Sequence, residues 1–169
     1  TPITIIQMLW VNIIMGTLGG LAFAGEPPLN YYMQEKPKSR DEEILSADMM
    51  HQICLCGVYS LVLCIAFLSS KTIRIMYGGL IPTDKFYTAF YVLFIFLGIF
   101  NCFSARCSRL WILSNIGKNK PFVLIMILIS VIQICMVYFG GTVFRCVPLL
   151  PYELSFVILL ASSVIPFEM

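Results

Sequence analysis

The chain has 169 residues, of which 59% are hydrophobic and 12% are charged, and its formal net charge is +2. Soluble domains carry about 45–50% apolar and about 25% charged residues, so the composition excludes an ordinary soluble domain. A mean hydropathy of +0.89 also excludes disorder, because disordered chains lack this much apolar surface. A membrane protein is the class that remains.

Long windows without Asp, Glu, Lys or Arg predict an all-α, polytopic transmembrane helix bundle of about five spans. A helix needs about 20 apolar residues to cross the hydrocarbon core, and four windows supply them. The fifth window is short, so its helix must begin within 148–152 and carry Glu153 near an interface, or continue past Met169. In one transmembrane domain over 1–169, we expect spans near 3–25, 49–70, 86–105, 121–139 and 150–168.

Local signals mark several helix ends. Glu26-Pro27-Pro28 stops the first helix, because consecutive prolines cannot continue it. Ser46, followed by Asp48, is a plausible N-cap for the second helix, and Gly140-Gly141 closes the fourth. The chain begins Thr1-Pro2 and carries no signal-peptide pattern, so we expect it to be a fragment.

The distribution of Lys and Arg predicts the orientation. Loops 26–48 and 106–120 hold seven of these residues, against four in 71–85 and 145–152. Because positively charged loops stay in the cytoplasm, we expect 26–48 and 106–120 to be cytoplasmic, the N-terminus outside and the C-terminus cytoplasmic.

The sequence contains no motif of soluble catalysis or nucleotide binding: GxxxxGK[ST], GxGxxG, GxSxG and HExxH are all absent. Seven cysteines without a CxxC pair argue against a zinc site or a disulfide framework. His51 and Cys54 lie one helical turn apart and can share a metal, although a helix-end histidine and a packed thiol are the better interpretation. We expect no cofactor in this chain and no nucleic-acid partner.

Any chemistry must therefore lie among the uncharged polar groups of the spans, most of which are expected to hydrogen-bond between helices. Asn12 differs because Gly16, Gly19 and Gly20 follow it. Glycines so close together let a partner helix approach, as in the Gly16/Gly20 GxxxG pair, or let the helix unwind and expose carbonyl oxygens. The other polar groups are Gln7, Thr17, Gln52, Asn101, Ser104, Gln133, Ser155, Ser162 and Ser163.

Several of these residues belong to runs that resemble one family. Residues 7–28, with Trp10-Val11-Asn12 and a closing Glu26-Pro27-Pro28, are similar to the sixth membrane helix of P-type calcium pumps of the plasma-membrane type, which reads WVNLIMDT and then EPP. Residues 100–106 resemble its FNxxNAR motif, and residues 132–149 resemble its IQ…FGG…F…PL passage. The resemblance implies the sixth to tenth helices of a ten-helix domain with a cytosolic chain end.

The resemblance implies calcium ligands at two positions of the first helix. Asn12 matches the family's ligand Asn, whereas Gly16 stands where the family has a ligand Asp. Loss of that carboxylate removes an oxygen ligand and the charge that offsets a divalent ion. Gly98 stands where two-site pumps of the reticulum type carry a Glu, so one calcium site at most is expected. ATP and magnesium are expected to act only through domains outside this chain.

Two functional hypotheses remain open. In the first, the chain is the C-terminal transmembrane part of an ATP-driven cation pump, with calcium as the expected ion, membrane lipid around it and the N-terminal half of a P-type ATPase as its partner. In the second, it is a degenerate or stand-alone membrane scaffold that transports nothing. A multi-pass location in the plasma membrane is expected for either. A secondary transporter ranks below both, because no repeat relates two halves of the sequence.

Overall fold

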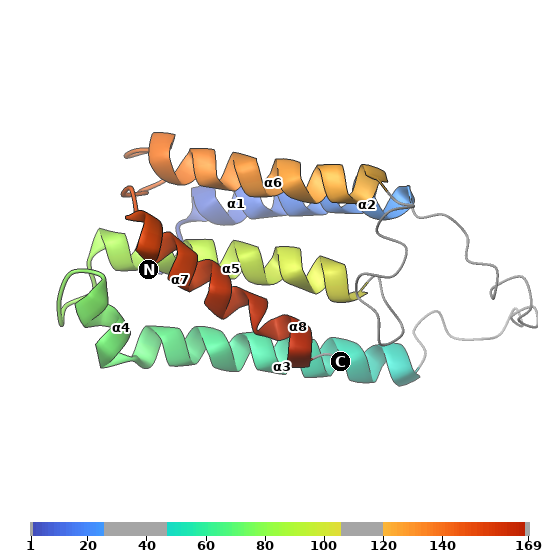
Figure 1. Cartoon of the computed structure of the whole chain (residues 1–169), viewed down its shortest axis with the longest axis horizontal. Helices are drawn as coiled ribbons and strands as arrows, with labels where there is room; N and C mark the ends of the chain where they lie inside the picture. The colour runs from blue at the N-terminus through green and yellow to red at the C-terminus, as the bar shows by residue number, and fades with distance from the viewer. Residues whose placement is uncertain (1, 26–46, 106–119, 168–169) are drawn as a thin grey trace, which may run out of the picture.

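The computed structural model describes residues 2–25, 47–105 and 120–167, and every regular element within them is a helix (Figure 1). The predicted all-α fold class is confirmed. The predicted Ser46/Asp48 cap and nearly all of loops 26–48 and 106–120 lie outside the residues whose side chains are described. The elements are α1 (Ile5–Ile13), η1 (Ile14–Leu18), α2 (Gly19–Ala24), α3 (Ala47–Ser69), α4 (Lys71–Met76), α5 (Asp84–Ala105), α6 (Lys120–Phe139), α7 (Pro151–Ser162) and α8 (Val164–Phe167).

Four helices in the described part of the chain are long and apolar enough to cross a membrane: Ile5–Ala24, Met49–Ser69, Asp84–Ala105 and Lys120–Phe139. The first of these is α1, η1 and α2 in direct succession. α7 has 12 residues, a length of about 18 Å, and Ser163 separates it from α8. The polytopic bundle therefore has four full-length helices and one shorter, interrupted helix.

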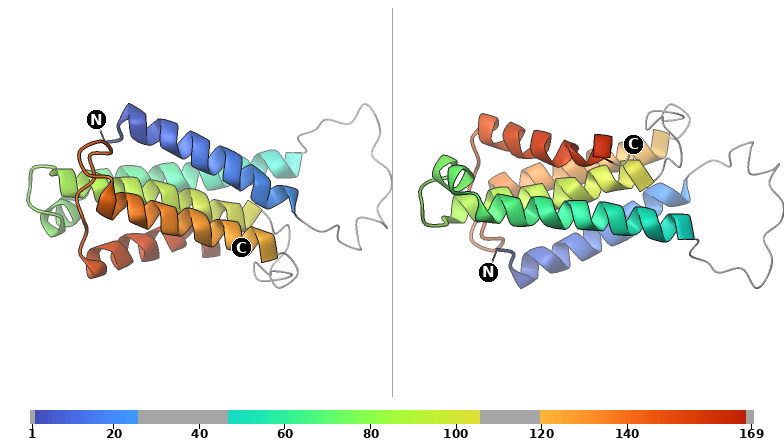
Figure 2. Two further views of the ribbon diagram at one scale, coloured as in Figure 1. Left: turned by 90° about the horizontal axis from the view of Figure 1, so that it is seen from above. Right: turned by 90° about the horizontal axis from the view of Figure 1, so that it is seen from below.

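α5 is the centre of the bundle. It packs against α3, α6, α7 and α8, and it contributes the longest run of buried residues, from Thr88 to Leu93. Two views at right angles to Figure 1 place α7 on one side of α5 and the N-terminal helix on the other (Figure 2). The N-terminal helix packs mainly on α6. α5 thus separates two faces of the bundle.

Side chains at the helix ends explain where several helices begin. The Thr4 hydroxyl accepts from the Gln7 backbone N–H at 3.2 Å, and the Gln7 side-chain oxygen accepts from the Thr4 N–H at 2.8 Å. This capping box satisfies two backbone donors at the start of α1. Ser70 separates α3 from α4, and its hydroxyl accepts from the Ile73 N–H. The short helix α4 was not predicted.

The connection between α6 and α7 is folded onto the bundle. Gly141 has φ +48°, a left-handed conformation that favours glycine after a helix end. The Gln7 amide donates to the Phe144 carbonyl at 2.7 Å, and the Val147 N–H donates to the Thr88 hydroxyl at 3.0 Å. Tyr138 also donates to the Leu149 carbonyl. These contacts join α1, α5 and α6 at one end of the bundle.

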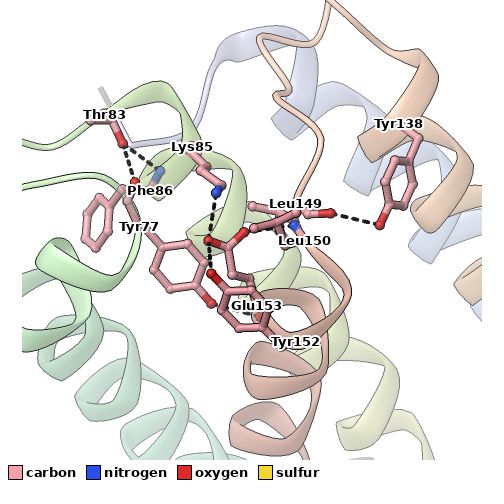
Figure 3. A network of polar contacts seen from close by, with 9 residues as sticks. All are labelled: Tyr77, Thr83, Lys85, Phe86, Tyr138, Leu149, Leu150, Tyr152 and Glu153. Atoms are coloured by element: carbon pink, nitrogen blue, oxygen red, sulfur yellow. Dashed lines mark hydrogen bonds and ion pairs between the residues drawn. The ribbon is translucent and has the colours of Figure 1, made fainter.

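A buried polar network holds α4, α5 and α7 together at the same end (Figure 3). The Glu153 side chain is 1% exposed, and its carboxylate pairs with the Lys85 ammonium at 2.7 Å. The carboxylate also accepts from the Leu150 N–H at 2.8 Å, which caps the start of α7. The Tyr77 hydroxyl donates to the Glu153 carbonyl at 2.8 Å. Burial, with the Glu153 charge nearby, raises the pKa of Tyr77, so the phenol stays a neutral donor.

Candidate functional site

The helix that carries Asn12 and Gly16 contains a π-helical turn. η1 begins at Ile14 and ends at Leu18, between two α-helical stretches. π-helical hydrogen bonds join residues five apart, and such insertions recur at functional sites. The Thr17 hydroxyl donates to the Ile13 carbonyl, one of the backbone acceptors beside the turn. The glycine-rich segment therefore widens the helix at Gly16 without interrupting it.

Asn12 and Gly16 are both exposed on this helix. No residue in the described part of the chain hydrogen-bonds to the Asn12 amide. A Cβ atom at Gly16 or Gly20 would meet nothing within 4 Å. The GxxxG interpretation therefore finds no packing partner within residues 2–25, 47–105 and 120–167, and the face that carries Asn12 and Gly16 is open.

Met15, in the same turn, points toward α5. A Cβ atom at Gly98 would lie 3.1 Å from the Met15 Cε atom, so this thioether fills the space beside Gly98. Gly98 is the position at which the sequence resemblance placed the Glu of two-site pumps. Here a methyl group occupies that space, and neither side chain can offer a hard cation the oxygen ligands that it prefers.

The described residues include no cluster of three or more His, Cys, Asp or Glu side chains that could hold a metal. His51 and Cys54 line the same hollow on α3, and both are exposed. The other residues of that hollow are Leu55, Val58, Tyr59 and Val62, which supply no third ligand of those types. The metal interpretation of His51 and Cys54 therefore gains no support from the fold.

The remaining polar groups of the spans divide into two sets. Thr17, Ser155 and Ser162 hydrogen-bond to backbone carbonyls of their own helix segments, and Ser163 pairs with the Tyr59 hydroxyl at 2.8 Å. Gln52 is exposed. By contrast, five buried side-chain atoms lack a hydrogen-bond partner among the described residues: Ser60 Oγ, Tyr91 Oη, Asn101 Oδ1, Ser104 Oγ and Gln133 Nε2.

Sequence reasoning missed Ser60 and the pairing of Lys85 with Glu153. Ser60 is one small hydroxyl among apolar residues, a pattern that is common in membrane helices. Glu153 did carry a signal, because it is an isolated charge at the start of the fifth apolar window. A buried carboxylate needs a positive partner, and Lys85 at the start of α5 supplies one.

The fold and this helix define a multi-pass integral membrane protein with an oxygen donor exposed on a spanning helix. The family model described as "Cation transporting ATPase, C-terminus" matches residues 1–169, and the chain belongs to this family. It is 32% identical to plasma membrane calcium-transporting ATPase 2 of Oreochromis mossambicus over 88% of this chain and 14% of that protein. It is 34% identical to plasma membrane calcium-transporting ATPase 3 of Homo sapiens, over 88% and 12% respectively.

A third relative, plasma membrane calcium-transporting ATPase 1 of Gallus gallus, is 34% identical over 86% of this chain and 13% of that protein. The chain thus spans about an eighth of the length of the curated relatives it matches. The resemblance to plasma-membrane-type calcium pumps is confirmed, as is the multi-pass membrane class. By this relationship the chain is an integral protein of the plasma membrane.

Proposed function

We propose that the chain forms part of the ion pathway of an ATP-driven calcium pump, in which domains outside this chain bind and hydrolyse ATP. The observation that carries the proposal is the position of Asn12. Its amide is an uncharged oxygen donor that is exposed on a spanning helix, two residues before a π-helical insertion. Placing a polar group inside a membrane costs free energy, and polar groups that face protein or water there are typical of ion pathways.

The chemistry of calcium supports a shared site. Calcium takes about six to eight oxygen ligands in flexible geometry, and Asn12 supplies one amide oxygen. Carbonyl groups next to the π turn are further candidates. The remaining ligands, and above all the negative charge, must come from the N-terminal half of a P-type ATPase. That half is the proposed partner, with membrane lipid around both.

The second candidate function is a membrane scaffold without transport, and Gly16 favours it. Gly16 has no side chain to bind an ion, and the described residues offer no carboxylate cluster in its place. A pump built with this helix should therefore bind calcium more weakly than its relatives. The two candidates differ in one respect, which is whether an assembled pump that contains this chain moves calcium at all.

The sidedness follows the distribution of positive charge. The last residues of α2 and α5 and the first residues of α3 and α6 lie at one end of the bundle (Figure 1). Loops 26–48 and 106–120 join these helices at that end. We assign this end to the cytoplasm because these loops carry most of the Lys and Arg residues. The Lys85–Glu153 network and the α6–α7 connection then lie outside.

Transport by a chimaeric pump tests the proposal. In human plasma membrane calcium-transporting ATPase 3, this chain replaces the matching region, and ATP-driven calcium uptake is measured in inside-out vesicles. Uptake that saturates at a higher calcium concentration than in the parent pump is expected. The isolated chain serves as a control and should form no phosphoenzyme from labelled ATP. A chimaera that reaches the membrane but takes up no calcium, even with Gly16→Asp, would support the scaffold instead.

A further inference from the structure

One amide side chain fastens the N-terminal helix to the connection between α6 and α7. Gln7 is 3% exposed, and its oxygen already accepts from the Thr4 N–H in the capping box. Its Nε2 atom donates to the Phe144 carbonyl at 2.7 Å and lies 3.9 Å from the Cys146 Sγ atom. Figure 2 shows this connection passing beside the start of the helix. The first turn of the helix is thus tied to a residue 137 positions away.

An aromatic pair makes a second contact at the same place. Trp10 lies one turn after Gln7, and its ring packs against the Phe144 ring with 5.3 Å between centroids and 71° between planes. Edge-to-face pairs of this kind are favourable beyond the area that they bury. Phe144 therefore holds the helix twice, through its carbonyl oxygen and through its ring.

Phe144 is itself held in place by the fold of the connection. A Cβ atom at Gly140 would lie 3.2 Å from the Phe144 Cβ atom, so the two residues are in close contact. The next residue, Arg145, has φ +49°, a left-handed conformation that is uncommon for a residue with a side chain. Its guanidinium pairs with Asp84 at 2.8 Å and lies 5.6 Å from the centre of the Tyr87 ring. These contacts anchor the connection on α5.

The Gln7 hydrogen bond differs in kind from the other contacts of the N-terminal helix. Among the described residues, Gln7 is the one residue of this helix whose side chain hydrogen-bonds to another segment. Further along the helix the contacts are apolar, as between the rings of Phe23 and Phe122 at 5.8 Å. Apolar packing is not directional, whereas a hydrogen bond requires a narrow range of distance and angle. The connection therefore fixes the register of the helix.

This register decides where Asn12 points. Successive residues of an α-helix are turned by about 100° around the axis, which places Asn12 about 140° from Gln7 and about 160° from Trp10. The face that meets the connection is thus nearly opposite the face that carries Asn12, in agreement with the burial of Gln7 and the exposure of Asn12. A slip by one residue would turn Asn12 by about 100° and shift it by about 1.5 Å.

We propose that Phe144 is a positioning residue that, through Gln7 and Trp10, sets the rotation and depth of the N-terminal helix and thereby places the Asn12 amide. This inference rests on the proposed function, in which Asn12 is an ion ligand. Calcium accepts its oxygen ligands at about 2.3–2.6 Å, so a turned or displaced helix loses the ligand although the amide is intact. Phe144 affects calcium binding without touching the ion.

The calcium dependence of uptake by the chimaeric pump that carries Gly16→Asp tests this role. Phe144→Ala should raise the half-maximal calcium concentration by about twofold to tenfold, the effect of one lost aromatic pair, with the maximal uptake per pump unchanged. Phe144→Tyr keeps the ring and should restore the parent value. Phe103→Ala removes a similar pair with Phe122, at 5.1 Å and 89°, and should change neither quantity. A fall in maximal uptake alone would show a loss of folding and overturn the positioning role.

A double substitution asks whether Phe144 acts through Asn12. Effects on a shared interaction are not additive, whereas independent effects are. In a chimaera that already carries Asn12→Ala, Phe144→Ala should therefore raise the half-maximal calcium concentration by less than about twofold. A full additional increase would overturn the proposed route through Asn12.

Hydrogen–deuterium exchange of the purified chimaera tests the contact without transport. Phe144→Ala should speed the exchange of backbone amides in residues 5–13 by about twofold or more, because local opening of the helix becomes easier, and Phe103→Ala should not. Faster exchange in a chimaera that moves no calcium would uphold the contact and reject the proposed function. Unchanged exchange in a chimaera that moves calcium would overturn the contact and leave the proposed function standing.

Discussion

At the residue scale, the proposed function assigns one ion ligand to Asn12 and none to Gly16. Both positions are exposed on the same spanning helix, and they are one turn apart, so that side chains at these positions would share a face. An Asp at position 16 would add a charge and up to two oxygens beside the Asn12 amide. Space is available, because a Cβ atom there meets nothing within 4 Å.

Gly16→Asp should raise the calcium affinity of the chimaeric pump by about tenfold or more, as expected for a charged ligand. Gly16→Asn, which has nearly the same shape but no charge, should raise the affinity much less. The measurement is the calcium concentration that gives half-maximal uptake. An Asp at a helix centre costs about 2.5–3.5 kcal/mol on insertion scales, so expression of both variants is also compared. Equal misfolding of both would favour a packing role for Gly16.

The Lys85–Glu153 pair predicts an asymmetric response to mutation. Lys85→Met leaves a carboxylate that is 1% exposed without its cation, and breaking a buried pair in this way costs about 3–5 kcal/mol. The midpoint of thermal unfolding in detergent should fall clearly. Arg145→Met removes an ion pair to Asp84 whose side chains are 47% and 52% exposed, and it should have little effect. Similar losses in both variants would contradict the assigned difference in burial.

At the element scale, the sequence predicted the long helices but neither the π turn of η1 nor the short helix α4. A span of about 20 apolar residues is required by the bilayer, so charge-free windows indicate helices whatever packs around them. The π turn of η1 depends on which carbonyl each N–H selects, and the residues Ile14–Leu18 carry no composition that separates a π turn from an α turn. α4 escaped prediction because its residues Lys71 and Arg74 made the segment read as a polar loop.

The α6–α7 connection provides a test at this scale. Cys146 is 6% exposed, and burial raises the pKa of its thiol while a hydrogen bond from Gln7 opposes that shift. Since only the thiolate reacts, Cys146 should label with maleimide at least about tenfold more slowly at pH 7 than Thr142→Cys, at an exposed position of the same connection. Its rate should rise as the pH rises. Both rates are measured in a background without other cysteines, and equal rates would contradict the folded connection.

At the scale of the whole molecule, the class and family could be recognised from sequence, whereas the internal contacts could not. Glu153 and Lys85 are 68 positions apart, and no local pattern indicates that one neutralises the other. Asn12 was singled out as a polar residue of a predicted span, whereas its exposure is a property of the assembled bundle.

The orientation of the molecule is tested by single-cysteine labelling in sealed cells. Lys38→Cys, in a loop expected to be cytoplasmic, should stay unlabelled by an impermeant reagent until the membrane is opened. Ile81→Cys, at a position that is 80% exposed between α4 and α5, should label from outside. The reverse pattern would invert the proposed topology, because consecutive loops of a spanning bundle lie on opposite sides.

A contribution of Asn12 to a calcium pathway is tested most directly by the calcium dependence of uptake. This dependence is measured for the Gly16→Asp chimaera and for the same chimaera with Asn12→Ala. Removal of the amide oxygen should raise the half-maximal calcium concentration by about tenfold or more. Ser155→Ala, which loses only a hydrogen bond to the carbonyl of Pro151 in its own helix, should leave that concentration unchanged. An Asn12→Ala chimaera that matches the Ser155→Ala control would contradict the claim.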